Sequence, residues 1–175
     1  MILSGFYRDS GGFTLIELVV VIIILGILAV VAAPKFMNVS RDAKVSSVES
    51  FLGDMKSMTT MLHMTAQIDG KLGDQVTIET DYGDYEFWRG YPEIKSEATN
   101  PNLYFLETFF GLSGAVSDSK TNTRRIVSYG DLSVYEDNND SRIGYGSGTL
   151  VADECYAGYR HTGTTESFII NTDGC

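Results

Sequence analysis

The sequence predicts an α+β protein in which a long N-terminal α-helix packs on a C-terminal antiparallel β-sheet. Three observations carry this prediction. An apolar run from Phe13 to Ala33 contains one charged residue, Glu17, close to its start. A stripe of apolar residues at spacings of three and four follows Pro34. From Arg125 onward, apolar and polar residues alternate in short segments that polar turns separate, and strands without helices between them favour an antiparallel sheet.

The apolar run is long enough to cross a membrane. As a helix rising 1.5 Å per residue, its 21 residues would reach about 32 Å, which matches the hydrocarbon core of a bilayer. A cleavable secretory signal has a shorter apolar core and an Ala-x-Ala-like site after it, whereas this run passes directly into Pro34, Lys35 and Phe36. We therefore expect the run to stay in the mature protein.

The amphipathic stripe after Pro34 extends the helix to about Asp69 and Gly70. An apolar face at this spacing packs against a core. We assign the four methionines in this region to gap-filling positions in that core. The stripe comprises Val48, Phe51, Leu52, Met55, Met58, Leu62 and Ala66, and the methionines are Met55, Met58, Met61 and Met64.

The remaining elements are shorter. From Gly70 to about Arg125 the signals are mixed: Val76, Ile78 and Thr80 alternate with polar residues, and the region is interpreted as a loop with short strands or a helical turn. Residues 103–112 indicate a short helix that ends at Gly111. After Arg125 we expect one strand, a polar turn at Asp137–Asp140, and a second strand. Residues 154–161 and 167–171 supply two more, giving a sheet of about four strands.

The charge of the body limits its partners. From Lys35 to Cys175 there are 12 Lys and Arg against 21 Asp and Glu, a net charge of −9. Binding of nucleic acid through its phosphates needs a basic face, so nucleic acid is an unlikely partner. The composition is compatible with a secreted or surface-exposed domain.

The two cysteines, Cys155 and Cys175, lie near the C-terminus. An even count beyond a membrane segment favours one disulfide in an oxidising compartment over two separate buried thiols. Neither cysteine has a second Cys or a His at zinc-ligand spacing, which argues against a zinc site.

Glu17 has two interpretations. Thr14 and Glu17 match the S/T-x-x-E capping box, in which both side chains satisfy free amides at the start of a helix. Alternatively, a carboxylate inside an apolar zone usually has a partner, and Phe13–Ala33 contains no Lys, Arg or His. The α-amino group of Phe13 would be such a partner if the chain were cut after Gly12, and between staggered chains it would set the register of subunits.

Residues Gly12 to Leu18, followed by an apolar run with Gly26 and Pro34, resemble the N-terminus of type IV pilins, of the type IVa class, and of type II secretion pseudopilins. The match is specific over Gly11–Phe36 and weakens after it. The resemblance implies cleavage between Gly12 and Phe13 by a prepilin peptidase that also N-methylates Phe13. Residues 1–12 would then be a removed leader, 13–34 a transmembrane and filament-core helix, and 35–175 a globular pilin body. The leader is only weakly basic, which departs from the usual pattern.

The resemblance also implies roles for individual residues. Glu17 would pair with a neighbour's N-terminal amine or support methylation, and the helix between Gly26 and Pro34 could lose regularity in a filament, as their weak helix propensity allows. The Cys155–Cys175 loop resembles the disulfide-bounded region that pilins use in contacts. The continuation Ala32–Phe36 is similar to mannose-sensitive haemagglutinin pilins, an adhesive branch.

These observations predict a structural subunit of a type IV pilus, with no enzymatic activity and no cofactor. Its expected partners are further copies of itself, the peptidase and N-methyltransferase, the inner-membrane assembly machinery and a surface or receptor that the sequence does not identify. It would move from the inner membrane to an extracellular fibre. The alternatives are a pseudopilin of a type II secretion system and a membrane-anchored binding domain that is never cut.

Other patterns are weaker. Asp137, Asn139 and Asp140 place oxygen ligands as a calcium loop would, but the Gly and Glu of an EF-hand are missing, so a hairpin turn is the favoured interpretation. His63 and His161 lack a ligand or nucleophile at a useful spacing. An aromatic cluster could bind sugar or another subunit, but a core position is its usual fate; it comprises Tyr82, Tyr85, Phe87, Trp88 and Tyr91.

Overall fold

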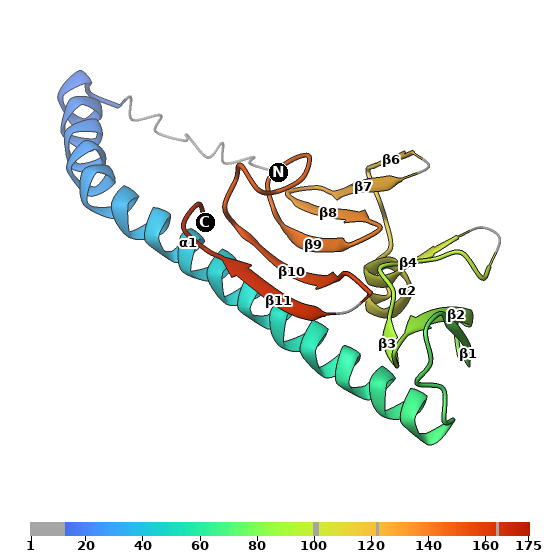
Figure 1. Cartoon of the computed structure of the whole chain (residues 1–175). Coiled ribbons are helices and arrows are strands. Elements are labelled where there is room, and N and C mark those ends of the chain that lie inside the picture. The colour runs from blue at the N-terminus through green and yellow to red at the C-terminus, as the bar shows by residue number, and fades with distance from the viewer. Residues whose placement is uncertain (1–12, 100–101, 122, 164) are drawn as a thin grey trace, which may run out of the picture. The chain divides into compact units, whose positions relative to one another are not determined.

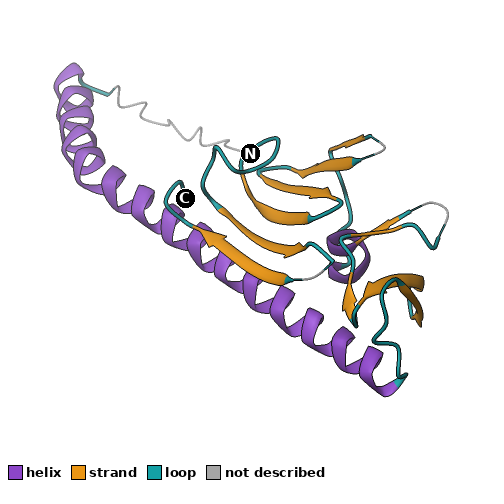
Figure 2. Ribbon diagram, in the orientation of Figure 1, coloured by secondary structure: helices purple, strands orange, loops and turns teal. Residues whose placement is uncertain are grey.

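The fold is known from a computed structural model, which describes residues 13–99, 102–121, 123–163 and 165–175. The predicted leader, including Gly12, lies outside the described residues. Contacts divide the chain into two compact units: a helical one that ends at Ser40, and a body of residues Arg41–Cys175. Figures 1 and 2 show the helix and the strands of the body.

Helix α1 spans Leu15–Ile68 without interruption. Within the body its inner face is formed by Val48, Met55, Leu62 and Ala66, which are all buried, so the predicted stripe is confirmed. Phe51, Leu52 and Met58 are partly buried against the same core.

Two of the four methionine assignments are wrong. Met61 and Met64 are 56% and 55% exposed, whereas Met55 is fully buried. Nine residues separate Met64 from Met55, which is two and a half helical turns, so the two side chains leave opposite faces of α1. The four methionines are close in sequence, but the helical period places Met55 and Met58 on the inner face of α1 and Met61 and Met64 on its exposed side.

The main sheet has six antiparallel strands in the order β11-β10-β9-β8-β7-β6. Each strand pairs with the next along the chain, so the sheet is a meander, and its central strands β8 and β9 are almost wholly buried. The strands are β6 (Ser117–Lys120), β7 (Arg124–Tyr129), β8 (Leu132–Asp137), β9 (Asp140–Tyr145), β10 (Tyr156–His161) and β11 (Glu166–Asn171).

The expected count of about four strands was too low for two reasons. The segment that we assigned to one strand turns at Gly130, whose φ of 79° is in the left-handed region that glycine adopts easily, and so forms both β7 and β8. The edge strand β6 consists of Ser, Asp, Ser and Lys, all exposed, and carries no apolar alternation. Charged, polar residues are typical of a protected sheet edge.

Smaller elements complete the body. Of the two alternatives for the region after Gly70, the structure has short strands: β1 (Val76–Thr80) pairs with β2 (Gly83–Trp88) and through it with β3 (Tyr91–Pro92). β4 (Lys95–Ser96) pairs with β5 (Leu103–Tyr104). The short helix is α2 (Phe105–Phe110), and it ends at Gly111 as predicted, because that residue takes the left-handed C-cap conformation.

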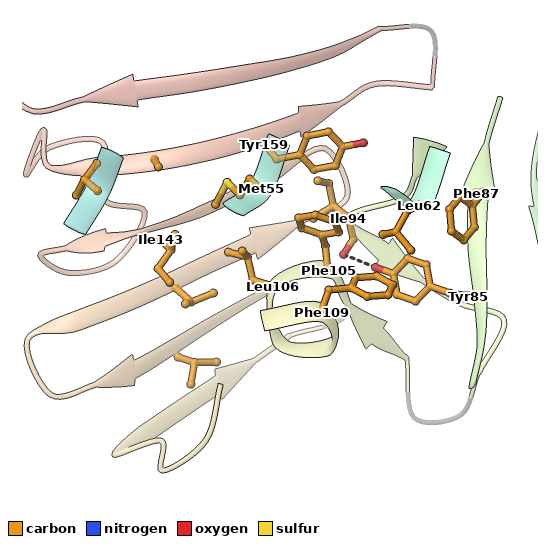
Figure 3. Packing of buried hydrophobic residues seen from close by; sticks show 14 of the residues in the cluster. Met55, Leu62, Tyr85, Phe87, Ile94, Phe105, Leu106, Phe109, Ile143 and Tyr159 are labelled. Atoms are coloured by element: carbon orange, nitrogen blue, oxygen red, sulfur yellow. Dashed lines mark hydrogen bonds between the residues drawn. The ribbon is translucent and has the colours of Figure 1, made fainter. Parts of the chain in front are cut away.

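One hydrophobic core joins these elements. Met55 and Leu62 from α1 lie among Tyr85, Phe105 and Phe109, as Figure 3 shows. Buried tyrosines need partners for their hydroxyl groups, and Tyr159 donates to the Pro92 carbonyl at 3.0 Å while Tyr85 donates to the Glu93 carbonyl at 2.8 Å. The core thus ties the second half of α1 to both the main sheet and the small one.

Candidate assembly site

The start of α1 is a complete capping box. The Thr14 amide donates to Glu17 Oε2 at 2.9 Å, and the Glu17 amide donates to Thr14 Oγ1 at 3.3 Å. The Thr14 hydroxyl also donates to the same carboxylate oxygen at 2.6 Å. The first helical hydrogen bond follows, from the Leu18 amide to the Thr14 carbonyl. The capping interpretation of Glu17 is therefore confirmed for the single chain.

Capping leaves the charge of Glu17 without a cation. The amide and the hydroxyl of Thr14 both donate to Oε2, and within the part of the chain that the structure describes, Glu17 makes no ion pair. Phe13, the residue whose α-amino group was the predicted partner, is exposed next to it. The two interpretations are thus compatible, and the inter-subunit role of Glu17 stays a prediction.

The apolar run presents its side chains uncovered among the residues that the structure describes. All the large apolar side chains from Leu15 to Val31 are exposed. Among the described residues this is the one helix that is long and apolar enough to cross a membrane. Such a large apolar surface is unfavourable in water, so it requires lipid or other apolar helices around it.

The predicted loss of helical regularity between Gly26 and Pro34 concerns a filament. In the single chain both residues lie inside α1, which continues beyond them. The environment at Gly26 is open, with no other group near the position that a Cβ would take. The break at Gly26 and Pro34 stays a prediction for assembled subunits.

The C-terminal loop is closed by a disulfide between Cys155 and Cys175, with Cα atoms 4.8 Å apart. Cys155 immediately precedes β10 and Cys175 follows β11, so the bridge joins the two ends of this edge hairpin. The Gly174 amide donates to the Glu154 carbonyl at 3.0 Å. The bridge confirms the predicted pairing, and it closes the hairpin at one edge of the main sheet.

The tip of the β8–β9 hairpin is the segment considered as a calcium loop. Asp137 Oδ1 accepts from the amides of Asn139 and Asp140 at 2.8 and 2.7 Å. Asp140 forms a bidentate pair with Arg160, at 2.7 and 3.1 Å. These bonds use the carboxylates as turn and strand partners, which confirms the hairpin. No group of three metal-binding side chains occurs among the described residues.

The aromatic cluster and the two histidines have different environments in the structure. Tyr85 and Phe87 are core residues as expected, whereas Tyr82 is 55% exposed at the β1–β2 turn. His63 stacks on Tyr91 with ring centroids 4.0 Å apart and bonds to the Gly90 carbonyl, which is a packing role. His161 is buried, and this burial lowers its pKa.

A buried carboxylate that sequence reasoning missed lies between the sheet and α2. Glu136 in β8 is 1% exposed and accepts from the Leu106 amide at 2.6 Å and the Ser141 hydroxyl at 3.1 Å. Burial raises its pKa to about 8, against the lowering effects of these bonds and of Arg125. The signal was present: Leu132, Val134 and Glu136 alternate, which places Glu136 on an apolar face of the strand.

Together, a long apolar helix that starts in a capping box and a body of antiparallel strands closed by a C-terminal disulfide agree with the architecture expected of a pilin. The comparisons agree. Residues 7–33 match the model of the prokaryotic N-terminal methylation motif. The chain is 35% identical over 88 residues to a type IV major fimbrial protein FimA of Dichelobacter nodosus, covering 50% of this chain and 52% of that protein.

Two further relatives represent the two predicted classes, one a type IV fimbrial protein and the other a type II secretion protein. A second type IV major fimbrial protein FimA of Dichelobacter nodosus is 44% identical over 62 residues, 35% of this chain and 37% of that protein. The type II secretion system core protein G of Pseudomonas aeruginosa is 44% identical over 57 residues, 33% of this chain and 38% of that protein. The chain thus spans about half the length of these relatives or less. No solved structure matches it.

Proposed function

We propose that this chain is a structural, non-enzymatic subunit of a type IV pilus. The observation that carries the proposal is an exposed apolar helix that starts in a capping box within a matched N-terminal methylation motif. In this proposal the precursor lies in the inner membrane, is cut between Gly12 and Phe13, and is N-methylated on Phe13. It then polymerises into an extracellular fibre for adhesion, surface attachment or motility.

The proposed partners follow from these steps of processing and polymerisation. The peptidase and N-methyltransferase act on the leader, the inner-membrane assembly machinery moves the subunit, and further copies bury the apolar helix. A helix makes its backbone hydrogen bonds within its own segment, so the apolar helices of several copies can exchange lipid contacts for contacts with one another. The similarity of Ala32–Phe36 to mannose-sensitive haemagglutinin pilins supports an adhesive fibre.

The second candidate is a pseudopilin of a type II secretion system. The identity to the type II secretion system core protein G favours it. Such a subunit would share the processing of the leader and would build a short periplasmic filament. The two candidates therefore differ in where the processed chain is found.

The mass of the intact chain in filaments sheared from the cell surface tests the proposal. A pilin gives a species that starts at Phe13, heavier than the unmodified chain by one CH2 unit, because a methyl group replaces an amine hydrogen, and lighter by the two hydrogen atoms lost in the disulfide. The same processed mass found only in the inner membrane favours the pseudopilin. An uncut chain contradicts both and leaves a membrane-anchored domain in which Glu17 is a helix cap.

A further inference from the structure

The body carries an apolar groove beside the second half of α1. Two adjoining hollows of about 310 and 590 Å³ share the lining residues Met58, Met61 and Phe109. Met61 is 56% exposed, and Tyr82, 55% exposed, packs edge-on against Phe109 with ring centroids 5.6 Å apart. The floor of the groove therefore presents apolar side chains that the described chain leaves uncovered.

The rim of this groove is acidic. Asp54 and Asp69 come from α1 and from the residue just after it, whereas Glu79 and Asp81 come from β1 and the turn that follows. All four carboxylates are exposed, and none forms an ion pair with a residue that the structure describes. The described lining contains no Lys, Arg or His. We call this surface the acidic groove, and its chemistry fits an apolar partner with a positive charge.

One segment of the same sequence has this chemistry. Val31, Phe36 and Val39 are 63%, 73% and 65% exposed on α1. Lys35 is the one charged residue between Leu18 and Ser40, and it is exposed. Residues four apart share a helix face, so Val31, Lys35 and Val39 form one stripe with Phe36 beside it. We call residues 31–39 the docking stretch.

We propose that the docking stretch of one copy packs on the acidic groove of a second copy, with Lys35 facing the carboxylate rim. The inference rests on the proposed self-assembly and names surfaces that carry it. The contact has to be between copies, because residues 31–39 and 54–68 belong to one continuous helix and cannot lie side by side in one chain.

This contact is heterologous, because the docking stretch and the acidic groove are different surfaces of the subunit. A heterologous contact that does not close into a ring produces an open helical array. With parallel helices, bringing Phe36 level with Met61 requires a stagger of 25 residues, or about 37 Å at 1.5 Å per residue. A Phe13–Glu17 contact needs a stagger of four residues, about 6 Å. The two contacts therefore involve different neighbours in the array.

Cysteine cross-linking in sheared fibres tests the contact. Phe36→Cys with Met61→Cys, after mild oxidation, is expected to give a ladder of covalent oligomers on a non-reducing gel, which collapses on reduction. Each single variant gives dimers at most. The matched control pairs Phe36→Cys with Val116→Cys, which is 77% exposed but outside the groove, and gives no ladder. Fibres of the first pair without a ladder overturn this inference and leave the proposed function standing, whereas absence of the unaltered chain from sheared material contradicts the proposed function itself.

A charge exchange tests the rim without new cysteines. Lys35→Glu is expected to reduce fibre yield at least tenfold while the processed subunit in the membrane stays at its normal level. Asp54→Lys or Asp69→Lys, added to Lys35→Glu, restores part of the yield, and Asp173→Lys, outside the groove, does not. The inference is wrong if Lys35→Glu assembles normally, or if neither groove variant restores assembly more than Asp173→Lys does.

Discussion

Glu17 combines two tasks in one side chain, and single substitutions can separate them. Gln at this position still fits the capping box, since its side-chain oxygen accepts from the Thr14 amide, but it has no charge. We predict that Glu17→Gln is processed at Phe13 and is absent from sheared fibres. The cap control is Thr14→Ala, which removes the hydroxyl and keeps the carboxylate, and it should still assemble. Immunoblots of membrane and sheared fractions measure both.

Equal assembly of Glu17→Gln and the unaltered chain would show that the carboxylate serves the helix start alone. Failure of both Glu17→Gln and Thr14→Ala would point to the conformation of the first turn rather than to its charge. The capping box explains why a carboxylate is tolerated there, because its bonds to Thr14 hold it at the end of the apolar run.

Glu136 predicts a dependence of stability on pH. Burial raises its pKa to about 8 in the folded chain, from an ordinary value of 4.5. Between these values the folded chain holds one more proton than the unfolded chain, so the free energy of unfolding falls as pH rises and levels off above 8. The fall is on the order of a few kcal/mol. Thermal unfolding of the chain in detergent at pH 5 to 8.5 measures it.

Glu136→Gln is the matched variant for this prediction. Its side-chain oxygen can accept from the Leu106 amide and the Ser141 hydroxyl as the neutral acid does. We expect it to fold and to lose the decline between pH 5 and 8. An unchanged decline in Glu136→Gln would assign the pH dependence to other groups.

At the scale of elements, the disulfide closes the hairpin of β10 and β11 at the edge of the sheet. The two cysteines are 20 residues apart, and in the chain-entropy model a bridge over this distance stabilises the fold by roughly 3 kcal/mol, because it lowers the entropy of the unfolded chain. Replacing Cys155 and Cys175 together by Ala should lower the unfolding midpoint by about 6–12 °C for a chain of this size. Calorimetry in detergent checks this, with the reduced unaltered chain as the control. A change under 2 °C would contradict a stabilising role for the bridge.

Element prediction from sequence succeeded where one periodicity dominated. The mixed signals around Val76 left short strands and a helical turn open. The stripe from Val48 to Ala66 and the helix ending at Gly111 were recognisable from apolar spacing and one glycine. The polar strand β6 was not, because its partner β7 and not its own side chains places it in the sheet. The acidic groove was missed for a related reason: its residues come from α1, β1 and α2, which only the tertiary fold brings together.

At the scale of the whole molecule, the two units of the chain differ in the surface that they present. The core of the body uses α1 from Val48 onward, and every large apolar side chain between Leu15 and Val31 is exposed. We therefore expect the body to fold without the apolar run, which in the proposed function packs with lipid and then with other copies. In the proposed pilin, the stability of the subunit would thus be separate from its assembly.

This separation predicts the result of two truncations. A chain that begins at Arg41 keeps Val48, Met55, Leu62 and Ala66, so we expect a soluble monomer whose unfolding midpoint in water lies within about 3 °C of the full chain in detergent, a change under 1 kcal/mol. A chain that begins at Gly70 lacks all four and exposes the core formed by Phe105 and Phe109, so it should aggregate or unfold. Circular dichroism and sedimentation compare the two. If the chain from Arg41 were also unfolded, the apolar run would have to contribute to the body, and assembly and folding would be one process.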